Sequence, residues 1–96
     1  MSQIEEVIQS PIFAKQKKKL KKNQIKKLDE AIKTIMAGPK IGQAKAGDLK
    51  GVRVYKYKLG NHHILLAYEI IESTLYLYTF GSYQNFYREL SKYIHQ

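Results

Sequence analysis

Cysteine is absent from the 96-residue chain, which excludes disulfide bonds, thiolate chemistry and zinc sites built on cysteine. No apolar run approaches the ~20 residues that a membrane-spanning helix needs. Residues 1–6 are acidic and lack the basic and then apolar order of a signal peptide. We therefore expect a cytoplasmic protein without a membrane partner. Its length predicts one domain, spanning residues 1–96.

Acidic residues are scarce: eight Asp and Glu stand against 17 Lys and Arg, which gives a net charge of +9. A domain this basic attracts polyanions, chiefly nucleic acid or the ribosome, or an acidic protein partner. A lysine face kept only for solubility is the alternative. Binding to a membrane surface is disfavoured, because no basic helix carries the bulky apolar face that it requires.

The first half of the chain predicts a strand and two helices. Residues 4–9 alternate weakly, as in a short strand. Ser10-Pro11 is typical of a helix start, because serine caps free amide groups and proline costs no hydrogen bond at the first position. We expect this helix to run to Lys22, and Asn23 to cap a second helix that Gly38-Pro39 ends. The second helix has an apolar stripe at helical spacing, formed by Ile25, Leu28, Ile32, Ile35 and Met36.

The second half predicts a loop, three strands and a helix. Residues 39–51 hold three glycines and no periodicity, which indicates a loop. Turn signals at Gly60-Asn61 and Glu72-Ser73 separate the strands. The strands are expected over residues 52–59, 62–71 and 74–80. A last helix is expected to begin near Gln84, with Phe86, Leu90 and Ile94 on one stripe.

The predicted fold class is α+β. An N-terminal strand, a helical hairpin packed on one face of a twisted antiparallel sheet, and a C-terminal helix make up the domain. The hairpin leaves the other face of the sheet open, and sheet twist makes that face concave.

Four segments carry a resemblance to a known family. They are SPIF at residues 10–13, GDLKGVRVY at residues 47–55, HILLAY at residues 63–68 and GSYQNFYR at residues 81–88, with a lysine-rich hairpin after the first. In this order, they resemble the RelE/ParE superfamily of toxins from bacterial type II toxin–antitoxin pairs, over nearly the whole chain. The ending is the most specific piece, since a subgroup closes on Gly-Ser-His-Glu-Asn-Phe-Tyr-Arg.

The resemblance implies one of two activities. RelE-like members cut mRNA in the ribosomal A site without a metal, whereas ParE-like members inhibit DNA gyrase. Both are neutralised by an antitoxin whose C-terminal segment wraps the toxin. The expected partners are therefore a cognate antitoxin, in a hetero-oligomer, and either mRNA with the ribosome or gyrase. A relative that only binds an antitoxin-like partner is a third alternative.

Metal-free RNA cleavage needs a base for the 2′-hydroxyl, cations for the charge on phosphorus and an acid for the 5′-oxygen. No cluster of carboxylates is available to hold magnesium, and the histidines are too closely grouped or too terminal for a metal site, so we expect no metal or cofactor. The candidate catalytic residues are Tyr87, Arg88, Arg53 and Tyr83.

Each catalytic candidate has an alternative role. Tyr87 matches the C-terminal tyrosine that the resemblance implies is catalytic, yet it could pack in the core beside Phe86. Tyr83 stands where the subgroup often carries histidine, and its ring can stack on a base. The Arg88 guanidinium can hold a phosphate or pair with an acid such as Glu72 or Glu89. Arg53 and Lys56 are three positions apart, so the two point to opposite faces of their strand, and a solvent-exposed strand residue without a role is the alternative for each.

Candidate RNA-binding residues come from two regions of the chain. Histidine is the usual proton shuttle near neutral pH, and His63 follows a turn, although a turn residue without a role is the alternative. The remaining candidates are lysines. The RNA-binding set is Lys18, Lys22, Lys26, Lys56 and His63.

Overall fold

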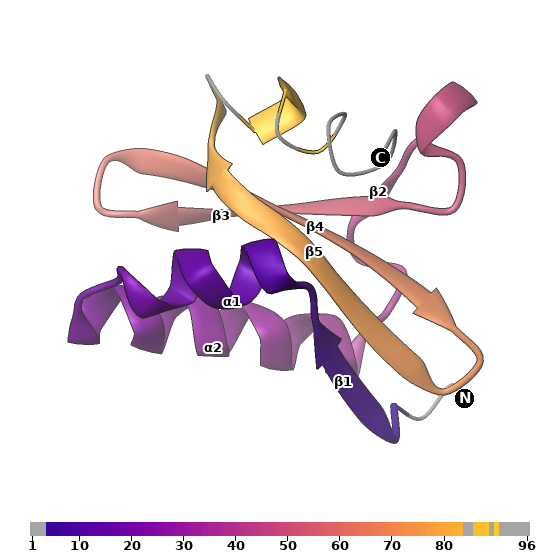
Figure 1. The fold of residues 1–96 in the computed structure, drawn as a ribbon, viewed down its shortest axis with the longest axis horizontal. Coiled ribbons are helices and arrows are strands. Elements are labelled where there is room, and N and C mark those ends of the chain that lie inside the picture. Colours follow the sequence, from indigo (N-terminus) through magenta and orange to yellow (C-terminus); the bar gives the residue numbers. More distant parts are fainter. Residues whose placement is uncertain (1–3, 84–85, 89, 91–96) are drawn as a thin grey trace.

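The structure is a computed structural model, which describes residues 4–83, 86–88 and 90 (Figure 1). Its elements are β1 (Glu6–Gln9), α1 (Pro11–Lys18), α2 (Lys22–Ala37), β2 (Gln43–Ala44), a 3₁₀ helix (Gly47–Leu49), β3 (Arg53–Leu59), β4 (His62–Ile71) and β5 (Thr74–Ser82). Residues 83, 86–88 and 90 are helical, and we call them the C-terminal helical segment. No helix in the described part is long and apolar enough to span a bilayer.

The five strands form one sheet in the order β1-β5-β4-β3-β2. β3, β4 and β5 make the predicted antiparallel meander, and β2 adds to it antiparallel. β1 runs parallel to β5, with Val7 opposite Leu75, and so adds a parallel strand to the edge of the antiparallel meander. Parallel neighbours need a long connection, and the chain between β1 and β5 supplies one.

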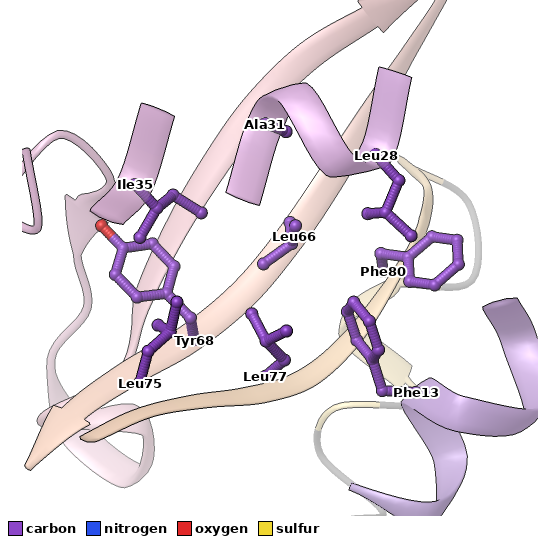
Figure 2. Close-up of a cluster of buried hydrophobic side chains, with 9 residues drawn as sticks. All are labelled: Phe13, Leu28, Ala31, Ile35, Leu66, Tyr68, Leu75, Leu77 and Phe80. Carbon is purple, nitrogen blue, oxygen red and sulfur yellow. The ribbon is translucent and has the colours of Figure 1, made fainter. Parts of the chain in front are cut away.

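Helices α1 and α2 cover one face of the sheet (Figure 1). Phe13 of α1 meets Phe80 of β5 edge to face, with ring centroids 4.9 Å apart. Leu28 and Ile35, from the predicted stripe of α2, are fully buried. The cluster on this hairpin face, shown in Figure 2, consists of Phe13, Leu28, Ala31, Ile35, Leu66, Tyr68, Leu75, Leu77 and Phe80.

The predicted start of α1 is confirmed. The Ser10 hydroxyl accepts a hydrogen bond from the Phe13 amide at 3.0 Å and donates one to the Tyr78 carbonyl at 2.6 Å. Pro11 occupies the first helical position. One serine therefore caps the helix and ties its start to β5.

The boundary between the two helices differs from the prediction. α1 ends at Lys18 instead of Lys22, and α2 begins at Lys22 after Lys21, its N-cap. Asn23 is consequently inside the helix and does not cap it. The reason is Gln24, whose side-chain oxygen accepts a hydrogen bond from the Lys21 amide at 2.8 Å and satisfies a donor at the helix start.

The second face of the sheet is partly covered, so the expectation of an open face was wrong. Phe86 and Leu90 of the C-terminal helical segment are 2% and 0% exposed. They pack on side chains of β3, β4 and the residue before β3. The cluster contains Val52, Val54, Leu65, Ala67, Phe86 and Leu90. Ile94 and Gln84, also assigned to this helix from the sequence, lie outside the described residues.

Tyr68 holds the chain between α2 and β3 in place. Its hydroxyl donates to the Pro39 carbonyl at 2.7 Å and accepts from the Gly42 amide at 2.9 Å. Burial raises the pKa of Tyr68, and the Gly42 hydrogen bond and the Arg53 charge lower it by less. The expected loop of residues 39–51 is held at its start by these bonds, and it also contains β2 and the 3₁₀ helix.

Replacing Gly42 tests this attachment. A Cβ atom there would lie 2.7 Å from the Tyr68 hydroxyl oxygen, closer than such atoms approach each other. We expect Gly42→Ala to lower the free energy of unfolding in urea by about 1–3 kcal/mol. The matched control is Gly38→Ala, since a Cβ atom at Gly38 meets nothing nearer than 3.9 Å. Equal stability of the two variants would contradict the attachment.

Tyr57 makes stability depend on pH at the alkaline end. Burial raises the pKa of Tyr57 to about 12, above the value near 10 of an unfolded tyrosine. The folded state therefore keeps a proton that the unfolded state releases. This contribution is complete below about pH 10 and is lost as the pH rises toward 12, at no more than about 1.4 kcal/mol per pH unit. The free energy of unfolding, measured in urea, should fall more steeply with rising pH in the wild type than in Tyr57→Phe. Identical slopes in the two proteins would contradict the effect of Tyr57.

Candidate functional site

The alternation of side chains along β3 assigns its charged residues to different faces. Val54 lies in the cluster under the C-terminal helical segment, whereas Tyr55 and Tyr57 pack against the hairpin-face cluster. Because side chains two residues apart share a face, Lys56 and Lys58 lie on the side of Val54. Both are exposed.

A histidine of β4 lies next to these lysines. Lys58 pairs with His63, and Lys56 with Leu65, across the antiparallel strands. Residues directly opposite each other in such a pair have Cβ atoms about 4.5–5.5 Å apart on one face. His63 is exposed as well. We call Lys56, Lys58 and His63 the basic strip.

The end of β5 brings an aromatic ring to the same place. Leu65 pairs with Gly81, and Tyr83 follows two residues later. The Tyr83 side chain is 64% exposed. Its ring meets the ring of Tyr87 at 6.3 Å between centroids, with an interplanar angle of 62°. The strand ends enclose a depression of about 560 Å³, which is lined by Asn61, His62, His63, Ser82 and Tyr83.

Tyr87 is half-buried and makes contacts on several sides. Its ring lies 5.0 Å from that of Phe86, nearly perpendicular to it. The Lys45 ammonium lies 5.3 Å from the Tyr87 ring centroid, within the range of a cation–π interaction. Packing next to Phe86 is therefore part of the role of Tyr87, and a catalytic role for its hydroxyl stays a prediction.

Arg53 does not join the other catalytic candidates. Its guanidinium donates to the carbonyls of Gly42 and Lys40 at 2.7 and 3.1 Å. It pairs with Tyr68, a residue of the hairpin face, so the sheet separates it from Tyr83 and Tyr87. Arg53 therefore lies on the hairpin face together with Tyr55 and Tyr57, as the alternation along β3 requires.

Arg88 is exposed and does not line the depression beside Tyr83. It lines a second depression of about 310 Å³ together with Gln16 of α1 and Ser82, and Ser82 is common to both depressions. Three of the four catalytic candidates, Tyr83, Tyr87 and Arg88, thus surround the end of β5. Glu89, proposed from the sequence as a partner of Arg88, lies outside the described residues.

The RNA-binding candidates are divided between two surfaces. Lys18, Lys22 and Lys26 are exposed on the hairpin, whereas Lys56 and His63 belong to the basic strip on the opposite face. Acidic residues offset part of the hairpin charge: Lys17 lies 3.5 Å from Asp29, and Lys27 lies 3.9 Å from Glu30. Lys58, at the strand edge, also lines a depression against α2 together with Lys27, Tyr55 and Tyr57, whereas His63 lies beside Tyr83.

Three residues of this surface had no role assigned from the sequence. Lys58 could have been found from the sequence, because it lies two positions after Lys56 and therefore shares its face of the strand. Asn61 belongs to a predicted turn and Lys45 to a predicted loop, so the sequence did not indicate that either residue would lie at the site. In the part of the chain that the structure describes, no group of three His, Asp or Glu residues could hold a metal ion.

Comparison with known proteins identifies the fold. A family model described as ParE-like toxin of type II bacterial toxin-antitoxin system matches residues 7–91. A mutant of the E. coli toxin RelE in the free state is 20% identical, with a TM-score of 0.70 over 96% of this chain and 97% of that one.

Two further solved structures are similar. A chain of the intact E. coli RelBE toxin–antitoxin complex is 19% identical, with a TM-score of 0.64 over 81% of this chain and 95% of that one. E. coli YafQ is 19% identical, with a TM-score of 0.54 over 88% and 99%. No curated protein sequence matches significantly. At these identities the solved structures establish a common fold, in agreement with the predicted RelE/ParE-like architecture.

The site depends on the anchoring of the C-terminal helical segment, which Phe86→Ala tests. Removing this nearly inaccessible ring leaves a cavity over β3 and β4 and should cost about 3–5 kcal/mol of unfolding free energy. Tyr83→Ala removes an exposed ring from the same segment and should cost about 1 kcal/mol or less. Urea denaturation followed by circular dichroism measures both, and similar losses in the two variants would contradict the anchoring.

Proposed function

The chain belongs to the ParE-like toxin family of type II bacterial toxin–antitoxin systems, within the RelE/ParE superfamily, and from this premise we propose that it is a ribosome-dependent mRNA endoribonuclease that arrests translation without a metal. The observation that carries the proposal is the basic strip beside Tyr83 and Tyr87. Lys58 and His63 pair directly across two strands, and Tyr83 follows the end of the neighbouring strand. Cations, a histidine and phenols are the groups that metal-free cleavage of RNA requires.

The proposed reaction follows from these side chains. His63 takes the proton of the 2′-hydroxyl, whose oxygen then attacks the adjacent phosphorus. Lys56 and Lys58 stabilise the extra negative charge that the phosphate acquires. The bond from phosphorus to the 5′-oxygen breaks, and the Tyr87 phenol, which the family resemblance makes catalytic, protonates that oxygen. The products are a 2′,3′-cyclic phosphate and a 5′-hydroxyl end.

The charge of the chain supports a ribosomal site of action. At +9, the protein is attracted to ribosomal RNA as well as to mRNA, and this attraction weakens with salt. The exposed hairpin lysines Lys18, Lys22 and Lys26 lie on the face opposite the basic strip. In this proposal they bind the ribosome while the strip binds the mRNA. The protein then acts in the cytoplasm, where translation takes place.

A cognate antitoxin is the other proposed partner. The solved RelBE structure of E. coli is a toxin–antitoxin complex, and an archaeal RelE from Pyrococcus horikoshii was solved with RelB. We infer that this toxin also forms a hetero-oligomer with its antitoxin. The chain has 17 basic and eight acidic residues, and this excess of positive charge favours an acidic antitoxin segment at the contact.

Inhibition of DNA gyrase, without nuclease chemistry, is the second candidate function. It is favoured by the position of Arg53, whose guanidinium is bound to the Gly42 and Lys40 carbonyls on the hairpin face. Without Arg53, the surface around Tyr83 and Tyr87 has one cation fewer to stabilise the charge on phosphorus than the sequence suggested. The matched family is also described as ParE-like.

Primer extension on a translated mRNA after induction of the toxin distinguishes the two functions. The nuclease proposal predicts codon-phased cuts, reduced about 10²- to 10⁴-fold in His63→Gln through loss of the proton-transferring group. Lys58→Gln should also reduce them, whereas Lys33→Gln, an exposed lysine of α2, serves as the control of equal charge change. A gyrase supercoiling assay runs in parallel. Inhibited supercoiling without cuts would establish the second function and overturn the first.

A further inference from the structure

The depression at the start of β4 and the end of β5 has one aromatic wall and otherwise polar sides. Asn61, His62, His63 and Ser82 line it together with Tyr83. Its volume of about 560 Å³ is ample for a planar ring system. Among the described residues, Tyr83 is the most exposed large hydrophobic side chain, at 64%. The exposed ring at the rim of the depression is accessible to a planar ligand.

The Tyr83 ring is held in position from behind. Its neighbour Tyr87 meets it edge to face at 6.3 Å. Tyr87 is itself fixed by Phe86, whose ring is 5.0 Å away and 2% exposed, and by the Lys45 ammonium at 5.3 Å. This row of contacts connects the exposed ring to the buried cluster. A ring held in this way loses little conformational freedom when a flat ligand stacks on it.

The polar sides of the depression suit the edge of a nucleobase. The Asn61 amide offers both a donor and an acceptor, and a neutral imidazole offers one of each. His62 and His63 start β4 directly after Asn61. Unpaired bases are recognised by such combinations of an aromatic ring with hydrogen-bonding groups at the base edge.

The basic strip supplies the matching site for a backbone phosphate. His63 belongs both to the depression and to the strip, and its cross-strand partner is Lys58. Lys56 lies on the same face, two residues along β3. A single-stranded RNA can therefore place a phosphate on the lysines while an adjoining base enters the depression.

We propose that this depression binds one unpaired nucleobase of single-stranded RNA, stacked on Tyr83 with its edge facing Asn61 and His62. The inference rests on the proposed function, because the mRNA strand that reaches Lys58 and His63 is the source of the base. Tyr83 then acts through its ring, and its hydroxyl is dispensable. This differs from the proton-transfer role that the subgroup histidine suggests for the position.

Binding of a fluorescein-labelled single-stranded RNA hexamer of mixed sequence to the full chain tests the site. Loss of one base stack should weaken binding about 5- to 150-fold in Tyr83→Ala. Tyr83→Phe keeps the ring and should bind like the wild type. Tyr76→Ala, which removes a half-buried strand tyrosine that does not line the depression, is the matched control.

Tyr83→Trp adds a direct readout of stacking. The chain has no tryptophan of its own, so the fluorescence of this variant reports on position 83 alone. Stacking of a base on the indole should quench it as the RNA hexamer is added. Failure of the wild type to bind the hexamer at low salt, or binding without quenching, would overturn the proposal. So would an equal loss of affinity in Tyr83→Phe and Tyr83→Ala.

The two proposals fail in different ways. If the hexamer binds and quenches Tyr83→Trp, but no codon-phased cuts appear after induction, the nucleobase site stands and the nuclease function is wrong. If cuts appear and Tyr83→Ala binds the hexamer as tightly as the wild type, the function stands and the nucleobase site is wrong.

Discussion

Side-chain alternation along β3 determines both how the sheet is packed and where the basic strip lies. Tyr55 and Tyr57 pack toward the hairpin, and Arg53 on the same face binds the loop carbonyls. Val54, and with it Lys56 and Lys58, points to the other side. A register shift of one residue would exchange the two sets, turning Lys56 and Lys58 toward the hairpin and Tyr55 and Tyr57 toward Phe86 and Leu90. The packing of the core therefore fixes which cations lie on each face of the sheet.

The C-terminal helical segment covers part of the sheet and also positions residues of the candidate site. Phe86 and Leu90 cover part of the second sheet face, and the start of β4 stays exposed beside the end of β5. Because Tyr87 follows Phe86 directly, this anchoring also sets the position of the aromatic pair Tyr83–Tyr87. Lys45, from the chain next to β2, adds its charge above Tyr87. Stability and the candidate site consequently depend on the same few buried contacts.

Local sequence signals predicted the elements that depend on local chemistry. The turn signals around β4 gave its bounds, and Ser10-Pro11 gave the start of α1. Alternation predicted that Arg53 and Lys56 face opposite ways, but it could not tell which face the last helix would cover, since that depends on distant packing of Phe86. β2 has only two residues, and Tyr68, far along the chain, holds the loop that leads into it. Such long-range contacts leave no periodic pattern in the sequence.

Chemical-shift mapping by NMR tests most directly the claim that RNA binds at the basic strip and the adjoining strand end. An isotope-labelled toxin would be titrated with the single-stranded RNA hexamer. The account predicts that shifts concentrate at Lys58, His63 and Tyr83, with smaller changes on the hairpin. Shifts concentrated at Lys22 and Lys26 of α2, with His63 and Tyr83 unchanged, would contradict it.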